Sequence, residues 1–199
     1  PDPSNASRPF ERARNGFVGT GGAVSMVLET KSEAQRRGAE PYAKFIGWGQ
    51  GSDGHNVAIS HPEGRGLKRA MTQALGDAGI SATDIDYVNA HAPSTSIGDA
   101  SEMKALKSVF PLPQEVLVSS TKALTGHGLS LSSIMEASFC CLALKDGFLP
   151  GSANVTDPDP ELGHLNLLRQ TEQTQAKRIL SNSSGFGGAN VSVIFEQAV

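Results

Sequence analysis

Apolar residues recur at helical spacing in some segments of the chain and alternate with polar residues in others. Between residues 66 and 78 they follow a period of 3.6 residues and Gly79 ends the run, which predicts an amphipathic helix. A longer helix is expected from about His127 to Lys145, where Glu136 is the only charge before the final lysine. A helix so apolar is expected to be buried on most sides. One apolar face of it is formed by Leu131, Ile134, Met135, Phe139 and Leu142.

Short strands are predicted between and after these helices. The succession of strands and helices predicts a layered α/β fold, with a mixed five-stranded sheet between helices. No internal repeat and no linker divides these residues. The expected strands are residues 24–28, 42–49, 85–90, 115–119, 165–168, 178–181 and 190–196, and two further helices are expected at 31–38 and 99–110.

The composition suits one soluble domain, since 38% of the 199 residues are hydrophobic and 19% are charged. A formal net charge of −3 gives no support to a nucleic-acid or membrane-surface partner. No apolar run is long enough to span a bilayer and no secretory signal is seen, so we expect a cytoplasmic protein. Cys140 and Cys141 are neighbours in a helical pattern and are expected to be core residues that do not bridge each other. No metal-binding spacing is seen.

Two histidines are candidates for chemistry. His91 follows the strand predicted at 85–90, and ligands of α/β sheets gather at the carboxyl ends of strands. His127 is expected at the start of the long helix, where the helix dipole and Lys122 disfavour the imidazolium. A neutral imidazole can donate an N–H to a developing oxyanion without titrating. The alternative for each is an ordinary hydrogen-bonded structural histidine.

Two further features each allow a structural and a functional interpretation. The spacing of Asp99 and Glu102 resembles a capping box, which favours Glu102 as a helix cap, and the alternative pairs Glu102 with Lys122. The glycine-rich sequence at 185–188 is typical of a hairpin turn. Alternatively, its glycines bring backbone N–H groups close to a ligand and leave Phe186 as a hydrophobic gate.

Four segments follow one another in the order of the later motifs of a known family. They read SRPFERARNGFVGTGGAVSMVLE at 7–29, YVNAHAPSTSIGDASE at 87–102, SSTKALTGH at 119–127 and SNSSGFGGAN at 181–190. Together they resemble the β-ketoacyl-acyl-carrier-protein synthases, nearest to the bacterial elongating condensing enzymes and their polyketide relatives, and the resemblance covers nearly the whole chain.

The resemblance implies a thiolase-like fold of two similar halves with the active site between them. Residues 1–50 would supply the last strands of the N-terminal half, and residues 51–199 the C-terminal half. The nucleophilic cysteine of the family lies in the N-terminal half, so we expect this chain alone to be inactive. It would need that half, or a companion ketosynthase chain, and its exposed strands would otherwise be an aggregation hazard.

The resemblance also implies an activity, the decarboxylative condensation of a malonyl-carrier protein with an acyl thioester in fatty-acid or polyketide synthesis. His91 and His127 would stabilise the enolate of the malonyl thioester, supported by the charged pair Lys122 and Glu102. No cofactor is implied, because the substrate is carried on the phosphopantetheine of an acyl carrier protein. A homodimer or heterodimer is expected.

Further roles follow from the same resemblance. The backbone N–H of Phe186, between Gly185 and Gly187, would complete the oxyanion hole while its ring gates the acyl pocket. Thr95 would hydrogen-bond the phosphopantetheine arm, and Ser184 would lie at the acyl pocket.

The sequence departs from the family at two places. Where relatives usually read His-Gly-Thr-Ser-Thr, residues 91–95 read HAPST, and Pro93 removes both a hydroxyl and an N–H. Ser184 replaces a phenylalanine that many relatives carry, which could widen the pocket. These departures leave open a non-catalytic partner similar to a chain-length factor. A thiolase-like enzyme acting on coenzyme A esters is a third reading, which fits the Thr-Lys-x-x-x-Gly-His pattern less well.

Overall fold

The computed structural model describes residues 2–111 and 116–198. None of its helices in those ranges is long and apolar enough to cross a membrane. The helices are α1 (Lys31–Arg36), α2 (Arg65–Ala78), α3 (Ser96–Val109), α4 (Lys122–Thr125) and α5 (Ser132–Asp146). The strands are β1 (Ala43–Ser52), β2 (Tyr87–Asn89), β3 (Leu117–Ser119), β4 (Phe148–Leu149), β5 (Asn166–Leu167), β6 (Glu172–Gln173), β7 (Arg178–Gly185) and β8 (Ala189–Gln197).

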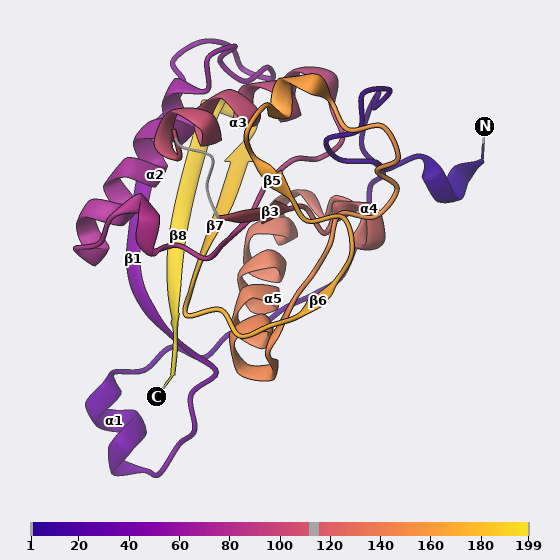
Figure 1. Ribbon diagram of the computed structural model, residues 1–199. Helices are drawn as coiled ribbons and strands as arrows, with labels where there is room; N and C mark the ends of the chain where they lie inside the picture. Colours follow the sequence, from indigo (N-terminus) through magenta and orange to yellow (C-terminus); the bar gives the residue numbers. More distant parts are fainter. Residues whose placement is uncertain (1, 112–115, 199) are drawn as a thin grey trace.

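The main sheet is mixed and has the strand order β1-β8-β7-β2-β3-β5 (Figure 1). Strand β2 runs parallel to both β3 and β7, whereas β8 runs antiparallel to β7 and to β1. The described sheet therefore has six strands, one more than the sequence predicted. The additional strand is β1, which was predicted as a strand at 42–49 but assigned to the N-terminal half. It pairs with β8 along its whole length, and residue 50 falls within it.

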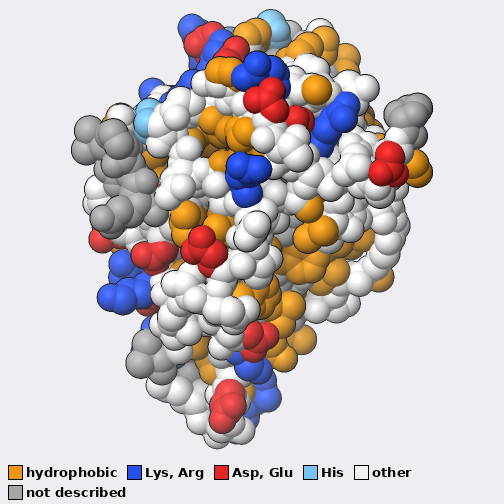
Figure 2. Space-filling model, turned by 45° about the vertical axis from the view of Figure 1, so that its right-hand side comes forward, with side chains coloured by type: hydrophobic (Ala, Val, Ile, Leu, Met, Phe, Trp, Pro, Cys, Tyr) orange, Lys and Arg blue, Asp and Glu red, His pale blue; other side chains and the backbone are white. Residues whose placement is uncertain are grey.

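Helix α5 covers one face of the sheet through its buried side, which contains Ala137, Cys140 and Leu144. The apolar face that the sequence predicted to be covered is turned away from the sheet, and Ile134 and Leu142 on it are 37% and 36% exposed. Within the described residues the helix is therefore covered on one side only. Apolar side chains also form patches on the face of the molecule shown in Figure 2.

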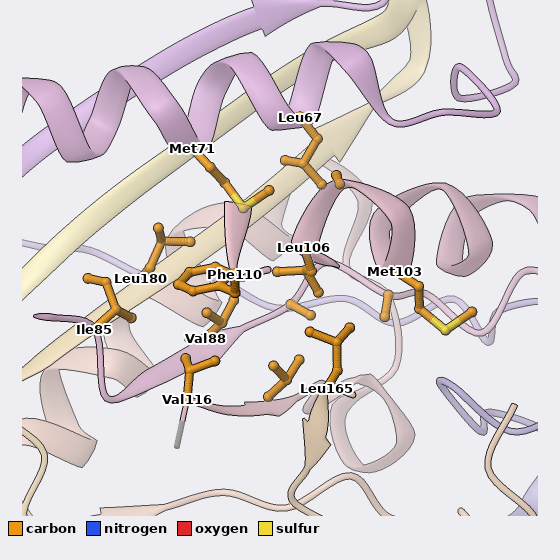
Figure 3. Close-up of a cluster of buried hydrophobic side chains, with 14 of the residues drawn as sticks. Leu67, Met71, Ile85, Val88, Met103, Leu106, Phe110, Val116, Leu165 and Leu180 are labelled. Atoms are coloured by element: carbon orange, nitrogen blue, oxygen red, sulfur yellow. The ribbon is translucent and has the colours of Figure 1, made fainter. Parts of the chain in front are cut away.

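Helices α2 and α3 cover the opposite face, so the molecule has three layers. Neighbouring strand residues point to opposite faces, as the pleat requires: Val88 lies in the cluster beneath α2 and α3, and Tyr87 lies in the cluster beneath α5. Leu67 and Met71 of α2 meet Leu106 of α3 over the strands (Figure 3). This packing confirms the amphipathic helix predicted at 66–78, whose C-cap is Gly79 in a left-handed conformation.

The edge strand β1 lies directly against α2 because alternate residues on that side are glycines. A Cβ added to Gly49 would lie 2.1 Å from the carbonyl oxygen of Ala70. The outer edge of β1 is also covered, since Asp77 and Gln73 of α2 accept hydrogen bonds from the backbone N–H groups of Trp48 and Gln50. Side chains of α2 thus satisfy donors that an edge strand would otherwise leave open.

Two predicted elements differ in the structure. Residues 24–28 form no strand; Val27 and Leu28 are 88% and 76% exposed, and the described chain pairs no strand with them. The long helix expected from residue 127 begins only at Ser132, because Gly126 and Leu129 adopt positive φ angles that interrupt a helix. The predicted strand at 115–119 is confirmed as β3 from Leu117, and Glu115 lies outside the described residues.

Candidate active site

Three strands bring predicted site residues to one edge of the main sheet. Strands β2, β3 and β7 are parallel to one another, so their carboxyl ends lie together. His91 follows β2, Lys122 follows β3, and Phe186 follows β7. This is the edge at which α/β sheets bind ligands.

The two histidines predicted to act together are neighbours in space. The ring centroids of His91 and His127 are 5.1 Å apart, and the ring planes are inclined at 80°. Phe17 contacts the other side of the pair, with its ring centroid 5.0 Å from that of His127. Both histidines line one cavity of about 750 Å³. The sequence prediction that both rings point into one pocket is therefore confirmed.

His91 is buried at the end of β2. Its backbone N–H donates to Glu102 Oε1 at 3.0 Å, and its carbonyl oxygen accepts from Lys122 Nζ. Nδ1 of the ring is buried and has no partner within the part of the chain that the structure describes, so Nε2 is the nitrogen that a ligand can reach. Burial lowers the pKa of His91 well below its usual range, and the charge of Lys122 lowers it further. The imidazole is therefore neutral.

His127 lies in the turn between α4 and α5 rather than at the start of α5. Its backbone forms a short bridge to the extended segment at 18–20, donating to the Val18 carbonyl at 2.7 Å. Burial, followed by the charge of Lys122, lowers the pKa of His127 to about 4. The sequence predicted that the neutral imidazole is favoured, and the lowered pKa agrees with this prediction. The main cause is burial and not the helix dipole, because α5 begins only at Ser132, five residues later.

Lys122 is fully buried, and its ammonium lies between the His91 carbonyl and Glu136 of helix α5. Nζ donates to the His91 carbonyl and forms an ion pair with Glu136 of α5, which is also fully buried. Burial raises the pKa of Glu136 to about 7, and the nearby lysine opposes this rise. A buried charge needs such a partner, and removing one member of the pair is strongly destabilising.

The structure differs from both sequence interpretations of Glu102, as a helix cap and as the ion-pair partner of Lys122. Helix α3 begins at Ser96, and its N-cap is Thr95, whose hydroxyl accepts from the Gly98 N–H at 3.2 Å. Glu102 lies in the second turn and accepts from the backbone N–H of Ala92 at 2.7 Å and from Asn182 Nδ2 at 3.1 Å. It therefore does not cap the helix, and the ion-pair partner of the lysine is Glu136. Glu102 holds the backbone that follows β2.

Most of the remaining predicted residues are also at the cavity. Thr95, Pro93, Ser184, Gly185 and Phe186 line it together with both histidines. The ring of Phe186 is 75% exposed, so nothing in the described chain packs over it. The Ser184 hydroxyl donates to Asn190 Oδ1 at 2.7 Å.

The glycine-rich hairpin at 185–188 is held by the loop that follows β1. The backbone N–H of Gly187 donates to the Val57 carbonyl at 2.6 Å and therefore does not face a ligand. Gly187 and Gly188 have φ angles of 83° and 77°, which few other residues adopt. The hairpin predicted from the glycines is confirmed, and Gly187 stabilises its shape.

Sequence reasoning missed two contributors to the site. Glu136 carried a usable signal, because a single carboxylate within an apolar helix rarely stays buried without a partner. Ser132 carried none, since its contact with His127 depends on the turn that precedes α5. No cluster of three His, Cys, Asp or Glu side chains suited to a metal ion is found in residues 2–111 and 116–198.

Comparisons with known proteins agree with this arrangement. Residues 42–156 match the family model described as beta-ketoacyl synthase, C-terminal domain. A 3-oxoacyl-[acyl-carrier-protein] synthase 2 of Staphylococcus aureus is 39% identical over 196 residues, which are 98% of this chain and 49% of that relative. The chain thus spans about half the length of the curated relatives it matches.

Two solved structures share the fold. A chain from a type II PKS acyl-carrier protein in complex with its ketosynthase bound to the hexaketide has a TM-score of 0.94 at 29% identity, over 98% of this chain and 48% of that chain. The ishigamide ketosynthase/chain length factor has a TM-score of 0.93 at 30% identity, over 100% of this chain and 48% of that chain. The fold is thiolase-like, as predicted, and the chain belongs to the β-ketoacyl synthase family, in which it matches the C-terminal domain.

Proposed function

We propose that this chain supplies the decarboxylation part of a β-ketoacyl-acyl-carrier-protein synthase active site. The observation that carries the proposal is the pair of neutral imidazoles, His91 and His127, with ring centroids 5.1 Å apart in one cavity. Both pKa values are lowered, so each ring donates an N–H without carrying a charge. Two such donors suit a single oxygen on which negative charge develops.

The chemical step is the loss of carbon dioxide from a malonyl thioester. The bond between the α-carbon and the carboxylate carbon breaks, and its electron pair delocalises onto the thioester oxygen as an enolate. His91 and His127 donate hydrogen bonds to that oxygen. The enolate carbon then attacks an acyl thioester on the family's cysteine, forming the new carbon–carbon bond and releasing the thiolate.

Lys122 has a supporting role in this proposal. Its ammonium is directed at the His91 carbonyl and at Glu136, so it holds the backbone of one histidine while its charge disfavours protonation of both. Thr95 and the exposed Phe186 both line the cavity. In this proposal the Thr95 hydroxyl hydrogen-bonds the phosphopantetheine arm, and the ring of Phe186 gates the acyl pocket.

The nucleophile is proposed to come from an N-terminal half or from a companion chain. Cys140 and Cys141 are both buried in α5, and burial raises the pKa of Cys141 to about 11 and that of Cys140 further. A thiol with so high a pKa is a poor nucleophile at neutral pH. The uncovered apolar face of α5 at Ile134 and Leu142 offers a surface for such a half.

The test is malonyl-carrier-protein decarboxylation by the complete synthase. His127→Ala is expected to lower the rate of carbon dioxide release about a hundred- to a thousandfold, as loss of an oxyanion donor does elsewhere. His55→Ala is the matched control, because this exposed histidine does not line the cavity. An unchanged rate in His127→Ala would refute the proposal.

A chain-length-factor-like partner is the second candidate. Pro93 and Ser184 at the cavity favour it, and one solved structure of this fold pairs a ketosynthase with a chain length factor. Such a partner needs neither neutral histidines nor a buried lysine. If His127→Ala leaves carbon dioxide release unchanged but alters the length of the product, this second reading is supported.

A further inference from the structure

Ser132, the first residue of α5, contacts the imidazole of His127 and lines the same cavity. Its side chain is buried, with 2% of the residue exposed. Its Oγ lies 2.8 Å from Nδ1 of His127 and accepts from the backbone N–H of Gly128 at 2.9 Å. The backbone N–H of Leu129 also donates to Nδ1, at 3.2 Å.

The positions of the hydrogens follow from this set of partners. A backbone N–H can only donate, so Nδ1 of His127 accepts from Leu129. The Ser132 hydroxyl has one proton, and because its oxygen already accepts from Gly128, that proton is free to point at Nδ1. A nitrogen that faces two donors does not carry a proton itself. The ring proton therefore resides on Nε2.

We propose that Ser132 is a positioning residue that fixes the tautomer and the orientation of His127. This inference rests on the proposed function, because a single oxyanion can use His127 only if its N–H lies on Nε2, away from Ser132. The hydroxyl is held by the start of α5, and the ring is held by the hydroxyl. Helix α5 thus orients the imidazole of His127 through Ser132.

The two imidazoles differ in this respect. Nδ1 of His91 is buried without a partner in the described ranges, and its ring is confined by burial alone. His127 is half-buried, so packing constrains its ring less, and hydrogen bonds must do so instead. Leu129 adopts a φ of 53°, an uncommon backbone conformation for leucine, and this turn brings its N–H back to the ring.

The experiment uses the complete synthase with Ser132→Ala, Ser132→Thr and Ser138→Ala. Ser138 is a matched control on the same helix, since its hydroxyl bonds to the Met135 carbonyl away from the cavity. We expect kcat for carbon dioxide release to fall about tenfold in Ser132→Ala with KM little changed, the effect of one lost hydrogen bond. Threonine retains the hydroxyl and is expected to restore most of the rate.

The ring nitrogens of selectively ¹⁵N-labelled histidine give a readout that a merely structural role would not move. In the parent protein, His127 is expected to show a protonated Nε2 and an unprotonated Nδ1. Ser132→Ala is expected to shift both signals towards a mixture of tautomers, and Ser138→Ala to leave them in place. Unchanged nitrogen signals and an unchanged kcat in Ser132→Ala overturn the inference, even where His127→Ala abolishes activity. If His127→Ala leaves the rate of carbon dioxide release unchanged, the proposed function is refuted instead. The nitrogen signals of Ser132→Ala then still decide whether Ser132 positions the ring.

Discussion

Replacing Lys122 with methionine separates the structural and the chemical contributions of the buried ion pair. Methionine keeps most of the apolar stem but removes the ammonium that pairs with Glu136 and donates to the His91 carbonyl. The carboxylate of Glu136 is then left without its cation in a fully buried position. Breaking a buried pair in this way typically costs about 3–5 kcal/mol of unfolding free energy.

The same substitution changes the histidines in a predictable direction. The charge of Lys122 is a cause of the lowered pKa values of both His91 and His127, second in size to burial. Without it, both pKa values are expected to rise towards the ordinary histidine range, and the imidazoles lose part of their protection against protonation. The loss of the Nζ–carbonyl hydrogen bond also leaves the backbone of His91 less firmly held.

A double variant, Lys122→Met with Glu136→Gln, distinguishes the two effects. It removes the unpaired carboxylate, so urea unfolding of the complete protein is expected to recover a large part of the lost stability. Histidine titration by NMR is expected to stay shifted upwards, and carbon dioxide release to stay low, because the ammonium is still absent. A single variant that loses less than about 1 kcal/mol, or a double variant no more stable than the single one, would refute this account of the pair.

Three further outcomes are expected. The imidazole of His127 should titrate at about pH 4 by NMR and stay neutral as pH falls through its ordinary value of 6.5, so protonation at about 6 would contradict the burial argument. Gly49→Ala would place a Cβ 2.1 Å from the Ala70 carbonyl and should cost about 3 kcal/mol in urea unfolding, whereas Gly76→Ala, with open space around it, should stabilise α2 by up to about 1 kcal/mol. This chain expressed without a partner half should aggregate or unfold without cooperativity, and a soluble, cooperatively melting monomer would count against the need for that half.

The elements with a strong local pattern were predictable from the sequence. Helix α2 follows a regular apolar period and ends at a glycine, so its bounds differ from the prediction by one residue. The position of His91 was predictable because a polar residue directly after a buried strand must lie at the carboxyl edge of the sheet. The four motifs gave the family and the thiolase-like fold, because the order of several weak signals is far more specific than any one of them.

The predictions that were wrong concern features that depend on contacts between residues distant in the sequence. Residues 24–28 have the composition of a strand, but a strand needs a partner backbone, and composition does not reveal whether one is present. The capping pattern at Asp99 and Glu102 was outweighed by Thr95, which caps the helix one turn earlier and leaves Glu102 free to accept from the loop after β2. Local spacing identifies a possible cap, whereas burial decides what a carboxylate binds.

The buried charges at the site also explain why its two carboxylates are not interchangeable. Glu102 accepts only from neutral donors, two backbone N–H groups and the Asn182 amide, so its negative charge is dispersed over dipoles that fix the position of His91. Glu136 is paired with the full charge of Lys122. Had Lys122 paired with Glu102 instead, the ammonium would be drawn to α3 and away from α5, and it would no longer link α5 to the backbone of His91. The observed pairing links the two histidines through one lysine, and the core of the fold thereby sets the geometry of the site.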